Sequence, residues 1–361
     1  MKTRKVKDLL VEPAESIESA MSILDETGQG IVLVTNEEKE LLGTVTDGDI
    51  RRGLLSGKNL GDEISSVMNE DPIVANKNMS EEAIVELMRA NTVQQIPLLD
   101  ERKRVDGIVL LRDLVEEETH RLKNPAVVLA GGLGTRLRPM THETPKPLLE
   151  VGDKPILEII VERLVSSGFE NIYLSICYEA EQIKEYFGDG QNHGVNISYI
   201  EEDDLTGTAG PLRLLAGEVE RPFLVMNGDL LTKVDFNSLL NFHKESGYEL
   251  TIGSTKYEFE IPYGVIRFKD EIGEIRGITE KPTEDFFVNG GIYALEPEVI
   301  NHIPEGQEYD MTDLIGKLLD KDKKVGSFPI HEYWLDIGEK DDYQKANGEY
   351  SEYFGEVENE A

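Results

Sequence analysis

Apolar residues recur with a helical period in two separate parts of the first third of the chain. Residues 16–26 and the segment that starts at Ser80 both carry apolar side chains every three to four positions, which predicts amphipathic helices. Each predicted helix is followed by two short apolar runs that predict strands, at 31–34 and 43–45 in the first case and at 96–99 and 107–110 in the second. Residues 1–122 therefore hold two copies of one unit, offset by roughly 64 positions, which we place at 1–60 and 61–122.

The pattern changes after Asn124-Pro125, which marks a domain boundary near residue 123. Predicted strands at 126–130, 171–177, 197–201 and 223–227 alternate with predicted helices at 155–167, 179–187, 210–217 and 237–246. A mixed region follows, with strands expected at 249–256, 263–268, 273–279 and 287–295 and a closing helix at 311–320. The sequence thus predicts an α/β domain over 124–350 and an acidic tail over 351–361.

The net charge of the chain limits the kinds of partner that it can bind. The chain has 37 Lys and Arg against 71 Asp and Glu, a formal charge of −34, which argues against general binding of nucleic acid or anionic membranes. A single cysteine excludes an intramolecular disulfide, and no apolar run reaches the roughly 18 residues of a membrane helix. No apolar segment follows the basic amino-terminal residues, so we expect a cytoplasmic protein.

The repeated unit carries a recognisable signature. Residues 43–52, Gly-Thr-Val-Thr-Asp-Gly-Asp-Ile-Arg-Arg, and residues 67–69 resemble a cystathionine-β-synthase (CBS) domain pair, an α+β arrangement. The resemblance implies a cleft for an adenosine nucleotide effector, with Asp49 on the ribose and Thr46 on a phosphate. Asp113 matches the ribose position of the second copy, where Leu110 replaces the threonine. The pattern also predicts that each copy ends in a helix that opens at an aspartate, Asp49 in the first and Asp113 in the second. As an alternative to ligand binding, the two aspartates are helix caps in a pair that serves for dimerisation.

A glycine-rich loop follows the first strand of the second domain. In Gly131-Gly132-Leu133-Gly134-Thr135-Arg136-Leu137-Arg138-Pro139, the glycines allow backbone N–H groups to form an anion-binding nest. Three nearby cations, Arg136, Arg138 and Lys146, against one acid, Glu143, give this stretch a formal +2 within an acidic chain, which favours a polyphosphate over a bare glycine turn. A dinucleotide fingerprint is excluded by Leu137 at its third glycine, and a P-loop by the lack of Gly-Lys-Ser/Thr.

The string from Leu129 to Pro139, followed by Pro145-Lys146-Pro147, resembles the signature of sugar-1-phosphate nucleotidyltransferases, over about 124–350. The resemblance implies a Rossmann-like, mixed-sheet nucleotide-diphospho-sugar transferase domain that converts a nucleoside triphosphate and a sugar 1-phosphate to nucleotide-sugar and pyrophosphate. Arg136 would screen the β- and γ-phosphates. Lys146, which we expect to be an exposed loop lysine, would screen the charge of the transition state. Further nucleotide contacts are implied for the loop residues Leu129, Gly131, Gly132, Gly134 and Thr135.

This reaction needs alignment, charge screening and a magnesium ion, which two carboxylates would hold. Asp229 follows the predicted strand 223–227, at the strand end where open α/β sheets bind ligands. Asp336 lies in Trp334-Leu335-Asp336-Ile337-Gly338, and both aspartates match metal-binding positions of the family. The alternative to metal binding is that Asp229 and Asp336 are each a solvated residue in a turn.

Sugar and base contacts are implied by the same resemblance. Glu280 and Lys281 would meet the sugar hydroxyls and the sugar phosphate, and Gly264 and Asn289 lie in further sugar-side segments. The segment containing Gly207 and Thr208 resembles the loop that faces the base, and it favours GTP, with a thymidylyl-transferring enzyme as the alternative.

Three classes of function remain open. The chain is a transferase tuned by its amino-terminal pair, a catalytically inactive nucleotide sensor, or a scaffold, in each case expected as a homo-oligomer. The joint presence of Arg136, Lys146, Asp229, Lys281 and Asp336 favours the enzyme.

Overall fold

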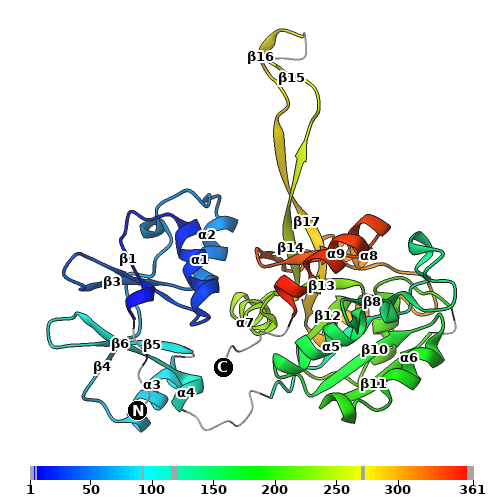
Figure 1. Ribbon diagram of the computed structural model, residues 1–361, viewed down its shortest axis with the longest axis horizontal. Helices are drawn as coiled ribbons and strands as arrows, with labels where there is room; N and C mark the ends of the chain where they lie inside the picture. The colour runs from blue at the N-terminus through cyan, green and yellow to red at the C-terminus, as the bar shows by residue number, and fades with distance from the viewer. Residues whose placement is uncertain are drawn as a thin grey trace. The chain divides into compact units, whose positions relative to one another are not determined.

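The computed structural model describes residues 4, 6–91, 93–114, 121–202, 204–269 and 273–355. The chain divides into two compact units, Met1–His120 and Arg121–Ala361, which are coloured blue to cyan and green to red in Figure 1. Within the described ranges, none of the helices has both the length and the apolar character needed to cross a membrane.

The first unit contains two small sheets of the same order. Strands β1 (Leu10–Val11), β2 (Val32–Thr35) and β3 (Leu41–Val45) form one sheet with helices α1 (Ile17–Thr27) and α2 (Asp47–Leu55). Strands β4 (Ala75–Asn76), β5 (Gln95–Leu99) and β6 (Val105–Leu110) form the other, with helices α3 (Glu81–Ala90) and α4 (Leu111–Leu114). A shared core of Leu9, Ile31, Leu33, Ile108 and Leu110 joins the two copies, as expected for units that bury their apolar faces against each other.

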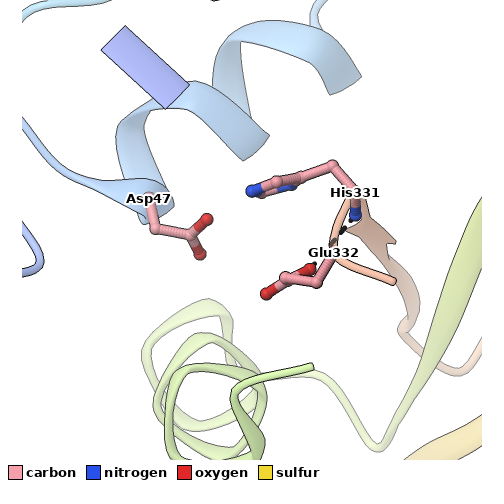
Figure 2. Close-up of side chains that lie close together, drawn as sticks. All are labelled: Asp47, His331 and Glu332. Carbon is pink, nitrogen blue, oxygen red and sulfur yellow. Dashed lines mark hydrogen bonds between the residues drawn. The ribbon is translucent and has the colours of Figure 1, made fainter. Parts of the chain in front are cut away.

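The second helix of each copy begins earlier than the sequence analysis places it. Helix α2 starts at Asp47 (Figure 2), and its N-cap is Thr46. Asp49 is the third helical residue and completes a capping box with Thr46 instead of opening the helix. In the second copy α4 starts at Leu111, two residues before Asp113.

The second unit is built on a seven-stranded mixed sheet of order β11-β10-β7-β12-β17-β14-β18. Its strands are β7 (Ala126–Leu129), β10 (Asn171–Ile176), β11 (Asn196–Glu201), β12 (Phe223–Asn227), β14 (Leu250–Glu260), β17 (Thr283–Leu295) and β18 (Val325–Ile330). The first four are mutually parallel, whereas β17 is antiparallel to both of its neighbours. After β18, the backbone N–H of His331 donates to the carboxylate of Glu332 at 3.1 Å (Figure 2).

Apolar side chains alternate between the two faces of this sheet, so both faces are covered. One face packs on α5 (Ile156–Ser166), α6 (Ala180–Phe187) and α7 (Phe236–Ser246). The other packs on α8 (Met311–Leu319) and the 3₁₀ helices η6 (Gly210–Leu215) and η7 (Pro297–His302). The predicted helix at 210–217 is thus a shorter 3₁₀ helix, with Pro211 at its start. Helix α9 (Lys340–Tyr353) runs into the predicted acidic tail, of which residues 356–361 lie outside the described part of the chain.

Strands β14 and β17 continue well beyond the sheet. Strand β18 accompanies β14 only to Thr255, whereas β14 and β17 stay paired as far as Glu260 and Thr283. A hairpin of β15 (Val265–Phe268) and β16 (Ile275–Thr279) follows, and Figure 1 shows this part projecting from the sheet. We call the described residues 256–269 and 273–287 the arm. The sequence predicts strands here but not a two-stranded ribbon that exposes large apolar side chains such as Tyr257, Phe259, Phe286 and Phe287.

Candidate active site at the end of the central strands

The glycine loop follows β7 and folds back closely on itself. Gly134 has φ +59°, a left-handed conformation, and caps the 3₁₀ helix η3 (Thr135–Leu137). A Cβ atom at Gly134 would lie 3.0 Å from side-chain carbons of both Lys146 and Thr141, closer than ordinary contacts allow. Gly134 is therefore required on two grounds, its φ and the close approach of Lys146 to the loop.

A largely enclosed lysine lies at the centre of the site. Lys146 Nζ donates to Asp229 Oδ2 at 2.5 Å, and its side chain is only 13% exposed. The expectation that Lys146 is an exposed loop lysine is therefore wrong, because the glycine loop and Asp229 enclose it. Gly228 brings Asp229 close to the loop: its N–H donates to Leu129 O at 2.9 Å, and a Cβ there would lie 2.8 Å from the same oxygen.

Backbone pairing places the second carboxylate beside the first. Strand β13 (Leu230–Thr232) pairs with β19 (Trp334–Asp336), with Leu230 opposite Asp336. The next residue after β19, Ile337, donates its N–H to Asp229 O at 3.0 Å. Asp229 and Asp336, more than a hundred residues apart in sequence, therefore meet at one edge of the fold.

The two carboxylates have the properties of cation ligands. Desolvation, followed by the negative charge of Asp229, raises the pKa of Asp336 above its ordinary value. Asp229 Oδ1 is buried and has no hydrogen-bond partner among the described residues. A buried carboxylate oxygen without a donor is costly, and a divalent cation would satisfy it.

A cavity of about 310 Å³ opens over these groups. Its lining combines the glycine loop with both partners of the central ion pair: Gly132, Leu133, Gly134, Thr135, Arg136, Leu137, Lys146, Leu205, Asp229 and Gly338. Arg136 and Asp336 both approach Gly338, where a Cβ would lie 3.5 Å from Arg136 Nη1 and 3.7 Å from Asp336 Oδ1. The structure thus places Arg136, Lys146 and Asp229 on the lining of one cavity, with Asp336 next to it at Gly338.

The remaining nucleotide-side residues lie close by. Leu129 ends β7, and Gly131 follows it at a point where a Cβ would lie 3.2 Å from Glu202 Oε1. Gly207 has φ +82°, and Thr208 donates its backbone N–H and its hydroxyl to Asp310 Oδ1, at 2.9 and 3.0 Å. Glu202 and Asp310 were not singled out from the sequence. Asp310 contacts Thr208, 102 residues away, so no local motif marks it. Glu202 contacts Thr206, four residues on, and Ser175 in another strand, so its local sequence shows only part of its role.

The sugar-side candidates are placed differently. Gly264 and Glu280 are neighbours, since a Cβ at Gly264 would lie 2.9 Å from Glu280 Oε2, and Lys281 N–H donates to Tyr263 O at 3.3 Å. These residues belong to the arm and do not line the cavity. Asn289 lies where the arm joins the sheet, and it donates to the hydroxyl of Tyr293 at 2.8 Å.

In the first unit, both predicted nucleotide-binding carboxylates have partners within the unit. Asp49 accepts from the backbone N–H and the hydroxyl of Thr46, at 2.8 and 2.7 Å, and from Arg52 at 2.8 Å. Asp113 accepts two hydrogen bonds from Arg4, at 2.7 and 2.9 Å, and its side chain is 6% exposed. The two half-sites therefore differ in what covers the acid: a neighbour in the same helix in one, and a residue 109 positions away in the other.

The mixed sheet and the loop-and-carboxylate site together define the class of protein. The chain belongs to the nucleotidyl transferase family, whose model matches residues 125–352, and CBS domains match at residues 4–56 and 64–119.

Two relatives show which activities are found among proteins similar to this chain. The chain is 38% identical over 240 residues to a UTP–glucose-1-phosphate uridylyltransferase of Synechocystis, covering 61% of this chain and 62% of the relative. A mannose-1-phosphate guanyltransferase of Schizosaccharomyces pombe is 37% identical over 228 residues, covering 60% of this chain and 62% of the relative. The chain thus spans less than two thirds of the length of these relatives.

Two solved structures share the fold. HddC from Yersinia pseudotuberculosis, in a complex with GMP-PN, matches with a TM-score of 0.51 and 26% identity, covering 63% of this chain and 99% of that one. A putative glucose-1-phosphate thymidylyltransferase from Bacillus anthracis, in complex with a sucrose, matches with a TM-score of 0.51 and 25% identity, covering 62% and 94%.

Proposed function

We propose that the second unit transfers a nucleoside monophosphate from a nucleoside triphosphate to a sugar 1-phosphate, releasing pyrophosphate. The observation that carries this proposal is the meeting of Lys146, Asp229 and Asp336 under the glycine loop. An acidic chain that keeps a largely enclosed lysine and an arginine at one cavity is suited to bring together two phosphate-bearing substrates.

The transfer itself needs no covalent enzyme intermediate. An oxygen of the sugar phosphate forms a bond to the α-phosphorus, and the bond from that phosphorus to the bridging oxygen of pyrophosphate breaks, with its electron pair leaving on pyrophosphate. Arg136 screens the β- and γ-phosphates, and Lys146 stabilises the charge that develops at the α-phosphate. The glycine-loop N–H groups orient the triphosphate.

A divalent cation, Mg²⁺ in our proposal, fits the carboxylate pair. Asp229 Oδ1 is the buried oxygen that lacks a donor, and the pKa of Asp336 is raised first by desolvation and then by the nearby negative charge of Asp229. Asp229 and Asp336 would hold the ion, which supplies charge neutralisation to the phosphates when bound.

GTP is the proposed nucleotide. Guanylyl-transferring relatives and a related structure with a guanine nucleotide analogue support this choice. Uridylyl- and thymidylyl-transferring relatives have comparable similarity, so a direct comparison of nucleotides decides it. On the sugar side we propose Glu280 for the hydroxyls, Lys281 for the phosphate, and Gly264 and Asn289 as further contacts.

We also propose that an adenosine nucleotide binds the first unit and regulates the transferase. Asp49, with Thr46, is the proposed contact for ribose and phosphate, because Arg52, which pairs with Asp49, has a side chain that is 54% exposed to solvent. Asp113 is held by Arg4 and is the less accessible of the two acids.

Pyrophosphate release tests the transferase proposal directly. The full chain is assayed with each common nucleoside triphosphate against a panel of sugar 1-phosphates, with Mg²⁺ and with EDTA. We expect release with GTP and at least one sugar 1-phosphate, and its loss in EDTA. Lack of product with every pair would favour a nucleotide sensor, and a faster reaction with UTP or dTTP would overturn the assignment of GTP.

A further inference from the structure

The loop 205–210 connects β11 to the 3₁₀ helix η6 and borders the cavity. Its first residue, Leu205, is 44% exposed and lines the cavity together with the glycine loop. Its last two residues, Ala209 and Gly210, are buried. The loop therefore presents one apolar side chain to the cavity and has its other end embedded in the protein.

From the sheet side, this loop is held by Glu202. Glu202 Oε2 accepts from the backbone N–H and the hydroxyl of Thr206, at 3.1 and 2.5 Å. The other oxygen, Oε1, accepts from the hydroxyl of Ser175 in β10 at 2.7 Å and lies against Gly131. One carboxylate thus joins strand β10, the glycine loop and the loop 205–210.

From the opposite side, the loop is held by the start of helix α8. Asp310 Oδ1 accepts both the N–H and the hydroxyl of Thr208, and that hydroxyl in turn accepts from Met311 N–H at 2.9 Å. Tyr309 O accepts the N–H groups of Ala209 and Gly210, at 2.9 and 3.0 Å. These contacts join segments about 100 residues apart in the chain.

Gly207 leaves no space for a side chain at this point of the loop. Its φ is +82°, and a Cβ there would lie 2.7 Å from Tyr309 O and 2.9 Å from Asp310 Oδ1. The contacts that hold the loop lie within the protein, so ordering it costs less conformational entropy when a ligand binds.

We propose that Glu202 and Asp310 are positioning residues that hold Leu205 against the planar base of the nucleoside triphosphate. This inference rests on the proposed transferase function. Neither carboxylate is required to touch the nucleotide: each acts through Thr206 or Thr208 on the loop. Their loss weakens nucleotide binding and leaves the sugar 1-phosphate and the chemical step largely unaffected.

Asp310 is tested with a matched neighbour. Asp310→Ala removes the contacts of Asp310 with Thr208. Asp313→Ala instead removes the carboxylate that accepts from Asp310 N–H at 3.1 Å, and this variant keeps the contacts with the loop. We expect Asp310→Ala to raise the KM for the nucleotide by about tenfold, with the KM for the sugar 1-phosphate and kcat within about twofold. Asp313→Ala should leave all three near wild type, and Asp310→Asn, which keeps an acceptor oxygen, should restore most of the nucleotide KM.

Glu202 provides an independent test. Glu202→Ala should raise the nucleotide KM by a similar factor, and Glu202→Gln should recover most of it, because an amide oxygen still accepts from Thr206. Glu201→Gln is the control, since Glu201 is exposed and pairs with Lys184 at 2.8 Å. If one of the two alanine variants does not fold, the amide variant of the same residue (Glu202→Gln or Asp310→Asn) takes its place. The alanine variant of the other residue then tests the proposal independently.

The outcomes separate this inference from the proposed function. Nucleotide affinity of the full chain is measured by calorimetry beside the kinetics. If wild type neither binds nor turns over any nucleotide, both proposals are wrong. If wild type is active but the alanine variants keep their nucleotide KM, or lose affinity for both substrates equally, only the positioning role is wrong.

Discussion

The cavity and the arm belong to the same unit and carry the two halves of one proposed site, yet they are built in opposite ways. At the cavity, Lys146 and Asp229 are fixed by close backbone approaches at Gly134 and Gly228. On the arm, Glu280 and Lys281 lie on an exposed hairpin whose neighbours include Tyr263, 74% exposed, and Ile278, 68% exposed. A two-stranded ribbon has little core of its own, so its conformation depends on what it contacts.

The difference suggests a division of tasks. Charge stabilisation requires groups that are held before the reaction begins, because reorganising them would cost part of the barrier reduction. Substrate recognition tolerates a segment that is ordered by binding. We therefore expect changes at the cavity to affect kcat and changes on the arm to affect the KM of the sugar substrate.

Removing the central cation should have the largest effect. Lys146→Ala is expected to lower kcat by about a thousandfold, since it takes away a preorganised charge at the α-phosphate. The variant also leaves Asp229 without its cation partner, so folding is checked by circular dichroism. Lys154→Ala, at a partly exposed lysine paired with Glu162, is the control. Turnover close to wild type in Lys146→Ala would refute its role.

Asp336→Asn should separate activity from stability. We expect activity to fall by about a hundredfold through loss of the cation. The melting temperature should rise at neutral pH, because the pKa of Asp336 is raised and its ionised form destabilises the folded state. As pH falls through the raised pKa, wild-type Asp336 becomes protonated and this gain should disappear. A gain that is equally large at acidic pH would contradict this explanation.

On the arm, Lys281→Ala should have a smaller and different effect. We expect the KM for the sugar 1-phosphate to rise about tenfold while the KM for the nucleotide is unchanged, because only one charge-assisted contact is lost. Lys256→Ala, on the same arm, is the control. In a mixture of Lys281→Ala with the nearly inactive Lys146→Ala, the raised KM for the sugar 1-phosphate should persist if each arm serves its own chain, and a return of that KM toward the wild-type value would show that the arm serves a partner.

The smallest change is expected in the first unit. Wild type should bind one adenosine nucleotide per chain, at Asp49, and Arg4→Ala should move the stoichiometry toward two, because it removes the two hydrogen bonds that Arg4 donates to Asp113. Calorimetry on the full chain measures this, with Asp49→Ala as the variant that loses the first site. Two bound nucleotides in wild type would mean that Arg4 does not block the second half-site.

Local patterns were sufficient for much of the architecture. The repeat in 1–122 and most strands and helices of the second unit were predictable, because apolar periodicity reflects which faces are buried. The helix starts at Asp47 and Leu111 were missed, since Thr46 and Asp49 form a reciprocal cap that places the acid inside the helix. The 3₁₀ helix at 210–215 and the arm were missed because their geometry depends on neighbouring segments.

By itself, the sequence identified the glycine loop and its cations as a phosphate site, since residue type and spacing set what they can bind. It identified the two aspartates through their match to the metal-binding positions of the family. Only the tertiary structure decided that Asp229 and Asp336 share one edge, that Lys146 is enclosed, and that Glu202 and Asp310 hold a loop from two sides. Apart from the contact of Glu202 with Thr206, those relations join segments that are far apart in the chain. They arise from backbone pairing and close packing between those segments, which local sequence patterns do not encode.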